Sequence, residues 1–426
     1  MGDTAWQLFV KLDRRDAALY LEDRARRGFT VIQAGIITWD GNIPNAYGHR
    51  AFDSADVSRP NDAYFRHVDA VIDMAAQQGL HVGFLPVFLG NRSLQWLVDR
   101  ATAYTYGRWL GARYRSKQNI LWVLGGDITP DYEPADVWRA LRGGAVAAVR
   151  GGGVGDIRRA LGLAKRLVLG VKSGGGPTGV WRALAKGIAV GVTGSEDYTR
   201  TIMTYHACGS PCVFHGDPWF SLNMIEVYED PARVYPAVSR DYHATPTKPT
   251  GIGEGFYEND NDGPGTPTGT AYDVRREAYW SFLAGGYYTY GARPIFFFGG
   301  GWQRALDLPG ARHMSIRRRL LTSRPWWTFV PDQGILARGE GSGDTLNAAA
   351  RSADGRSIIV YLSHPSVVSV NMGKITGRHM VKAQWFDPGS GRRTDAGVFP
   401  NTGTRSFFTP RGWRDAILLL DVASPA

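Results

Sequence analysis

The chain has 426 residues, of which 43% are hydrophobic, and a formal net charge of +10 at pH 7. This length allows one large domain and a smaller one, and no apolar stretch approaches the roughly 20 residues of a membrane span, so we expect no membrane partner. Eight Lys or Arg and one acidic residue between Arg142 and Leu184 supply +7 of the charge, which leaves the rest close to balanced and argues against a nucleic-acid partner.

Helices and strands alternate along the first two thirds of the chain. The spacing of apolar residues predicts helices over 16–27, 62–78 and 100–114. Short runs of apolar and β-branched residues predict strands over 29–34, 80–86, 119–124, 201–205, 223–228, 250–254 and 286–290. This alternation predicts β/α units and a parallel sheet.

The predicted fold class is α/β, with a (β/α)8 TIM-type barrel. The strands above number seven, so a closed barrel needs one more, and its place is just before Gly2. The chain holds at most a stub there, and we expect the first strand to be largely absent.

A glycine-rich basic segment interrupts the pattern. Val137-Trp-Arg-Ala-Leu141 recurs as Val180-Trp-Arg-Ala-Leu184, and removal of one period leaves a well-formed helix start. We therefore interpret residues 138–180 as an insertion at the start of a helix. Since the start of such a helix faces the catalytic mouth, the insertion is either a substrate lid or a functionally neutral loop.

The pattern changes after about residue 330. Strands are predicted over 357–362, 381–386 and 416–421, with turn residues between them and no helical spacing. We predict a barrel domain over 1–330, followed by a small antiparallel β-sandwich over 331–426.

Two acidic residues follow buried strands of the predicted barrel. Asp127 ends the run Asn119-Ile-Leu-Trp-Val-Leu-Gly-Gly-Asp127, and Glu254 ends the run Pro249-Thr-Gly-Ile-Gly-Glu254. The carboxyl ends of barrel strands open on one face, where catalysis takes place. Two carboxyl groups that face each other there fit glycoside hydrolysis, in which one protonates the leaving oxygen and the other attacks the anomeric carbon or activates water.

Other polar and aromatic residues lie at strand ends or in the loops beyond them, where they would contact a sugar. These candidates for substrate binding are Asp3, Gln33, Asn45, Tyr47, His206, Trp219, Glu226, Tyr290 and Trp302. Structural alternatives stay open. Asp3, which we place after the missing strand, would instead cap the first helix, His206 would be a buried structural residue, and the tryptophans would hold their loops in place.

We expect no metal and no cofactor. Cys208 and Cys212 together with His206 offer too few ligands for a metal site. The glycines of residues 151–155 do not follow a strand, as a dinucleotide site requires.

Motifs in most parts of the chain resemble the apiosidase-like glycoside hydrolases, a family with a (β/α)8 barrel followed by a β-sandwich. The matching motifs are Gly2-Asp-Thr-Ala-Trp6, Arg27-Gly-Phe-Thr-Val-Ile-Gln33, Asn45-Ala-Tyr-Gly48, Arg59-Pro-Asn-Asp-Ala-Tyr-Phe65, the run that ends at Asp127, Met203-Thr-Tyr-His206 and Asp273-Val-Arg-Arg-Glu-Ala-Tyr-Trp280. The tail around 381–388 resembles the collagen-binding-type β domain of that family, a description that we do not take as a function.

The resemblance places the two catalytic carboxylates at Asp127 and Glu254, in agreement with the strand ends. In barrels of this type the acid of the fourth strand, here Asp127, would be the acid/base, and that of the seventh strand, Glu254, the nucleophile of a retaining enzyme. The separation of the carboxyl groups decides this, because about 5–5.5 Å indicates retention and about 6.5–9.5 Å inversion. The resemblance also implies export, although no signal peptide precedes the first motif, and a substrate among plant cell-wall polysaccharides that carry terminal furanosyl residues such as apiose.

Three alternatives stay open. The chain would be a catalytically inactive carbohydrate-binding protein if the missing strand or the insertion abolished turnover. It would instead be a glycosidase for another sugar, such as arabinofuranose. Glu226 stands where we expect an amide in relatives, which would change the polarity of the site. Nucleic-acid binding through residues 142–182 would show a steep salt dependence.

Overall fold

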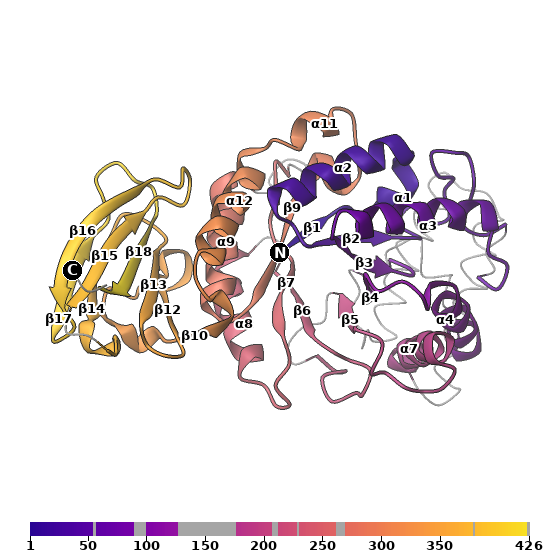
Figure 1. Ribbon diagram of the computed structural model, residues 1–426. Coiled ribbons are helices and arrows are strands. Elements are labelled where there is room, and N and C mark those ends of the chain that lie inside the picture. Colours follow the sequence, from indigo (N-terminus) through magenta and orange to yellow (C-terminus); the bar gives the residue numbers. More distant parts are fainter. Residues whose placement is uncertain are drawn as a thin grey trace, which may run out of the picture.

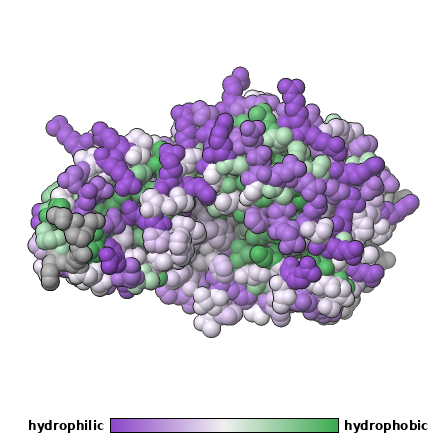
Figure 2. Space-filling view, in the orientation of Figure 1, coloured by the Kyte–Doolittle hydropathy of each residue, from purple (hydrophilic) through white to green (hydrophobic). Residues whose placement is uncertain are grey.

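The computed structural model describes residues 1–53, 57–88, 99–126, 176–206, 212–227, 230–260, 269–377 and 380–423. Figure 1 shows two parts, a barrel of strands surrounded by helices and a smaller β region that contains the C-terminus. Hydrophilic side chains cover most of the face seen in Figure 2, and hydrophobic ones gather there in small groups. No helix in the described ranges is both long enough and apolar enough to cross a membrane.

The strands of the first part form a nearly closed parallel barrel, as predicted. In chain order they are β1 Gly2–Thr4, β2 Val31–Gly35, β3 His81–Leu85, β4 Ile120–Gly125, β5 Met203–His206, β6 Asn223–Glu226, β7 Thr250–Glu254 and β9 Tyr287–Ala292, with the short β8 Tyr257–Glu258 beside β9. Their order in the sheet is β5-β4-β3-β2-β1-β9-β7-β6. The seam between β5 and β6 is therefore where the described strands leave the barrel open.

The first strand is short but it occupies its place in the barrel. Asp3 in β1 is the register partner of Ile32 in β2 and of Tyr290 in β9, so β1 joins the two neighbouring strands. The expectation that Asp3 follows this strand is wrong, because Asp3 lies within it. Backbone pairing on both sides fixes these three residues as a strand although they are too few to show a sequence pattern.

Most of the helices cover the outside of the barrel (Figure 1), and the short α1 and α10 contribute residues to the cavity at its mouth. They are α1 Leu8–Lys11, α2 Arg14–Arg27, α3 Asp62–Gln77, α4 Arg100–Tyr114, α7 Gly176–Thr193, α8 Val234–Tyr242, α9 Ala271–Leu283, α10 Arg293–Phe296, α11 Trp302–Ala305 and α12 Pro309–Thr322. Side chains that accept hydrogen bonds from first-turn N–H groups start several of them: Asp13 at α2, Asn61 at α3, Asp99 at α4 and Thr270 at α9. Most of the predicted insertion lies outside the described residues, and residues 176–180 form the first turn of α7.

Helices α4 and α7 approach each other closely through glycines. Gly107 and Gly111 of α4 pack on α7, and Gly187 and Gly191 of α7 pack on α4. A Cβ atom on Gly111 would lie 2.2 Å from the carbonyl oxygen of Ile188, which is far inside van der Waals contact. Only glycine therefore allows this backbone-to-backbone packing. It fixes α4, the helix before β4, against α7, the next described helix after β4.

The C-terminal part is antiparallel β structure, as predicted. Its strands are β10 Phe329–Pro331, β11 Leu336–Arg338, β12 Ala348–Ser352, β13 Ser357–Leu362, β14 Val367–Asn371, β15 Met380–Phe386, β16 Arg393–Pro400, β17 Thr404–Phe408 and β18 Ala416–Val422. They form a six-stranded sheet, β10-β12-β13-β18-β15-β16, and a three-stranded sheet, β11-β14-β17. Buried side chains from both sheets, such as Val360, Val370 and Leu418, form a separate core.

Helix α9 joins the two parts. Its Arg275 forms a buried ion pair with Asp415, with Nη2 and Oδ1 2.6 Å apart. Tyr279 of the same helix stacks on Tyr361, with ring centroids 5.0 Å apart. The Tyr361 hydroxyl also donates to Asp415, at 2.9 Å. Polar and aromatic contacts thus tie the β region to the side of the barrel.

Candidate active site

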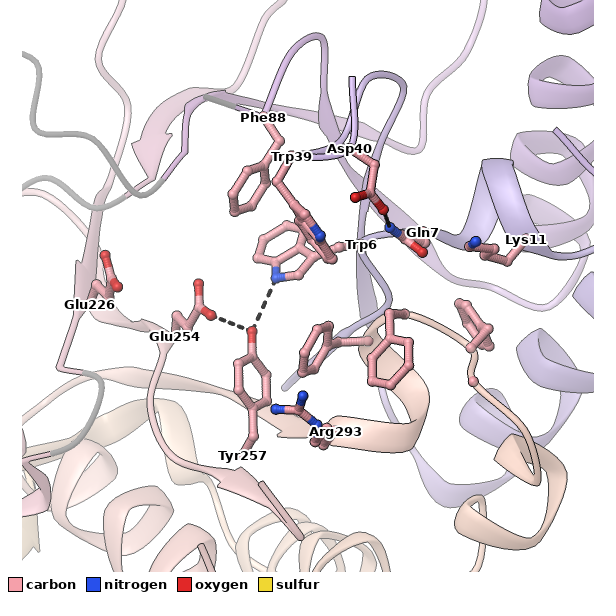
Figure 3. A pocket seen from close by; sticks show the side chains of 14 residues that line it. Trp6, Gln7, Lys11, Trp39, Asp40, Phe88, Glu226, Glu254, Tyr257 and Arg293 are labelled. Carbon is pink, nitrogen blue, oxygen red and sulfur yellow. Dashed lines mark hydrogen bonds between the residues drawn. The ribbon is translucent and has the colours of Figure 1, made fainter. Parts of the chain in front are cut away.

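A cavity of about 660 Å³ opens at the carboxyl ends of the barrel strands. It is lined by Trp6, Gln7, Lys11, Trp39, Asp40, Phe88, Glu226, Glu254, Tyr257, Arg293, Phe296, Phe297, Phe298 and Gly299 (Figure 3). These residues end strands or follow them directly, so the barrel topology itself brings them together.

Glu254, the last residue of β7, lines this cavity and is 7% exposed. The Tyr257 hydroxyl donates a hydrogen bond to Glu254 Oε1 and accepts one from Trp6 Nε1 at 3.0 Å (Figure 3). Nε2 of His206 lies 2.8 Å from the other carboxylate oxygen, Oε2. The carboxylate of Glu254 therefore lies between Tyr257, which donates to Oε1, and His206, which lies against Oε2.

His206 ends β5 and is fully buried. Its ring packs edge-to-face on Trp6, with centroids 5.1 Å apart, and lies 5.7 Å from the Phe88 ring. The described lining of the cavity does not include His206, whose imidazole contacts Glu254, a residue that does line it. The contact of His206 with a substrate stays a prediction.

A second carboxylate, Glu226, ends β6 beside Glu254. The two are register partners in neighbouring parallel strands, at a point where the register shifts between Ile225 and Glu226. Both side chains line the cavity (Figure 3). Of the predicted substrate-binding residues, Glu226 is the one that the described cavity contains.

Aromatic rings form much of the cavity wall. Trp39 packs edge-to-face on Phe88 and on Phe296, at centroid distances of 5.5 and 5.8 Å. Phe296 also lies 4.8 Å from the Tyr257 ring. Aromatic faces provide apolar surface and a preferred geometry for a ligand that has C–H faces, as sugar rings do. Across the cavity, Gln7 Nε2 donates to Asp40 Oδ2 at 2.9 Å.

Several predicted site residues lie inside the barrel rather than at its mouth. Asp3 is buried and forms an ion pair with Arg24, with Nε and Oδ2 2.6 Å apart, and it accepts from the Tyr20 hydroxyl. Burial raises the pKa of Asp3, and the Arg24 charge opposes that rise. Gln33 donates to the Gly253 carbonyl across the barrel at 3.0 Å. These side chains hold strands and helices together, and none of them lines the described cavity.

The remaining predicted residues also make structural contacts. Tyr290 is buried and donates to Glu258 at 2.6 Å, and Asn45 accepts from the backbone N–H of Tyr47 within a loop turn. Trp219 donates from Nε1 to Asp217, and Trp302 packs against Phe298. These four residues and the half-exposed Tyr47 are absent from the lining of the described cavity. The contacts of Asn45 and Trp219 stabilise the loops in which these residues lie.

Asp127 lies outside the described residues, two positions beyond the end of β4. Its role and its separation from Glu254 stay predictions. Within the described ranges, no group of three His, Cys, Asp or Glu side chains could hold a metal ion.

The sequence reasoning missed Trp6, Gln7, Trp39, Asp40, Phe88, Tyr257, Arg293 and Phe296. Trp6 closes the motif Gly2-Asp-Thr-Ala-Trp6, and Tyr257 comes three residues after Glu254, so both carried a signal. Of the other aromatic residues, Trp39 and Phe88 lie in loops and Phe296 ends the short helix α10, and a strand pattern does not determine the direction of these segments.

The family model described as the apiosidase-like catalytic domain matches residues 1–328. A second model, described as a collagen-binding domain of a collagenase, matches residues 330–421. A search of curated proteins found no significant match.

Solved structures with the same fold are glycoside hydrolases. One described as a glycoside hydrolase has a TM-score of 0.80 at 24% identity, over 100% of this chain and 93% of the other. A family 5 glycoside hydrolase from Bacteroides vulgatus has a TM-score of 0.79 at 24% identity, over 99% and 88%. A family 27 β-L-arabinopyranosidase from Geobacillus stearothermophilus has a TM-score of 0.54 at 12% identity, over 100% and 97%. At these identities the structures share the fold alone, whereas the family model spans the whole barrel, and on that match the chain belongs to the apiosidase-like glycoside hydrolases.

Proposed function

We propose that this glycoside hydrolase removes terminal furanosyl residues, apiose or a sugar like it, from plant cell-wall polysaccharide with retention of configuration. The observation that carries the proposal is the carboxylate of Glu254, which lines a cavity with aromatic walls and lies between the Tyr257 hydroxyl and the His206 ring. The family match supports an apiose-like sugar, and the substrate is the finer part of the proposal.

In the proposed mechanism Glu254 is the nucleophile. One carboxylate oxygen attacks the anomeric carbon as the bond to the leaving oxygen breaks, and Asp127 gives its proton to that oxygen. A water molecule then loses a proton to Asp127 and attacks the anomeric carbon, which releases the sugar and restores Glu254. Tyr257 keeps the carboxylate aligned through the hydrogen bond to Oε1.

The competing proposal is a carbohydrate-binding protein without turnover. The two differ in a single measurement, hydrolysis of aryl glycosides that include an apiofuranoside and arabinofuranosides, together with branched pectin fragments. Release of apiose supports the proposed substrate, and release of arabinose supports the other sugar. Binding without release supports the binding protein.

The stereochemical outcome has its own test. Proton NMR during the first minutes of hydrolysis distinguishes the anomers of the released sugar. We expect the configuration of the substrate to be retained. An inverted product would mean that Glu254 activates a water molecule as general base and does not attack the anomeric carbon itself.

A further inference from the structure

Glu277 lies on α9, behind the turn that follows Glu254. It is fully buried and is absent from the lining of the described cavity. Its Oε2 and Oε1 accept hydrogen bonds from the backbone N–H of Phe256, at 3.1 and 3.3 Å. Oε2 also accepts from the Tyr288 hydroxyl, at 2.9 Å. A helix on the outside of the barrel thus holds the backbone two residues beyond the proposed nucleophile.

The turn lies very close to this carboxylate. A Cβ atom on Gly255 would lie 2.3 Å from Oε2 of Glu277, so the backbone reaches the carboxylate only because residue 255 is glycine. The Glu277 side chain cannot move aside easily, because Phe256 and Tyr288 hold it. Glu254 and Tyr257 flank the turn, and both line the cavity.

We infer that Glu277 is a positioning residue of the active site, which sets the place of Glu254 and Tyr257 by anchoring the Gly255–Phe256 turn to α9. This inference rests on the proposed role of Glu254 as nucleophile. Displacement of a reacting group by about 1 Å can cost about 10²-fold in rate, so an anchor outside the cavity controls kcat without touching the substrate.

The chain contains a matched control in Glu258. This carboxylate is also buried, accepts from a tyrosine of β9, Tyr290, and accepts from a backbone N–H, that of Gly310 at the start of α12. Its backbone partner, Gly310, lies at the start of α12 and not in the Gly255–Phe256 turn. Loss of Glu258 therefore measures what loss of a buried, hydrogen-bonded carboxylate does to the fold.

The experiment compares Glu277→Ala, Glu277→Gln and Glu258→Ala with the wild type, at a temperature well below every melting midpoint. We expect Glu277→Ala to lower kcat about 10-fold or more, with KM changed less than about 2-fold, because the cavity walls stay in place. Glu277→Gln keeps an acceptor for Phe256, so its kcat should stay within about 3-fold of wild type. Glu258→Ala should lose about as much thermal stability as Glu277→Ala does, and its kcat should stay at the wild-type value.

A double-mutant cycle tests the close contact. Gly255→Ala should lower kcat by itself, because its Cβ atom pushes against Glu277. In Gly255→Ala combined with Glu277→Ala the obstruction is gone, so the combined loss should be clearly smaller than the product of the two single losses. Fully multiplicative losses, or a Glu277→Ala enzyme with the kcat of Glu258→Ala, would overturn the inference.

A crystal structure of Glu277→Ala provides a readout that does not depend on turnover. We expect a displaced turn and a broken Tyr257–Glu254 hydrogen bond. An unmoved turn would overturn the positioning role, even if no glycoside is hydrolysed. Failure of the proposed function itself would appear differently, as normal activity in Glu254→Gln.

Discussion

Nε2 of His206 lies 2.8 Å from Oε2 of Glu254, and the two residues come from the ends of β5 and β7. The described strands β5 and β6 are the two ends of the sheet order, so this contact spans the seam of the barrel. This side-chain contact links the edge strand β5 to β7, the neighbour of the other edge strand β6, at the place where the proposed nucleophile lies.

Replacement of His206 by Asn should therefore lower kcat about 10- to 100-fold, because Oε2 of Glu254 loses its neighbour. Steady-state kinetics checks this. His67→Asn is the control, since His67 is also buried but lies on α3. An unchanged kcat in His206→Asn would show that the imidazole does not support Glu254 in the reaction.

The Tyr257 hydroxyl should matter more than its ring. Tyr257→Phe keeps the packing against Phe296 and removes the group that links Trp6 to Glu254. We expect kcat to fall about 10-fold, with KM nearly constant, since one aligned hydrogen bond to the carboxylate is lost. Tyr361→Phe, which removes a buried hydroxyl in the β region, should leave both constants unchanged. Equal effects of the two substitutions would contradict the specific role of Tyr257.

Trp39 tests the aromatic wall. Trp39→Ala should raise KM about 3- to 10-fold, because loss of an aromatic contact costs about 0.5–1.5 kcal/mol. Trp327→Ala is the comparison, because Trp327 is 72% exposed and lies far along the chain from the cavity residues. If the Trp39 variant binds and hydrolyses its substrate as the wild type does, the sugar does not contact this wall.

Glu277 predicts a pH dependence of stability. Burial raises the pKa of Glu277 to about 7, with Asp273 adding to the rise and the Tyr288 hydroxyl, the Phe256 N–H and Arg276 opposing it. The unfolded chain loses this proton near pH 4.5 and the folded chain near pH 7, so the stabilising contribution is full below pH 4.5 and is lost as pH rises to 7.

The difference in unfolding free energy between Glu277→Gln and wild type should therefore grow in favour of the variant by about 3 kcal/mol from pH 4.5 to 7. Denaturant melts across this range measure it. Burial lowers the pKa of His67 and of His313 to about 4, and their effects cancel in the difference because both proteins carry them. A constant difference across the range would show that Glu277 does not titrate there.

The sequence predicted the barrel well because its signals are local. Each predicted strand begins or ends within a few residues of an observed one, since apolar runs between helices determine which residues are buried. The position of Glu254 at the mouth followed from topology alone, because parallel strands all end on the same face. The predicted strand 250–254 is β7 itself.

Most of the predicted binding residues lie away from the described cavity for a physical reason. A polar residue in a strand can point into the barrel, where another buried group satisfies it, and this is what Gln33 and Tyr290 do. Asp3 likewise has its partner, Arg24, on α2, and no spacing in the sequence indicates that pair. Trp39 reaches the cavity from a loop and Phe296 from the short helix α10, and the course of both segments depends on tertiary packing.

Hydrolysis of the best glycoside by wild type and Glu254→Gln, with melting curves for both, tests the central claim most directly. Gln has nearly the same shape as Glu but cannot act as a nucleophile, so we expect the rate to fall at least about 10²-fold while the melting midpoint stays close to that of the wild type. A variant that keeps a near-normal rate would contradict the account, because the carboxylate held by Tyr257 and His206 would then have no part in the reaction.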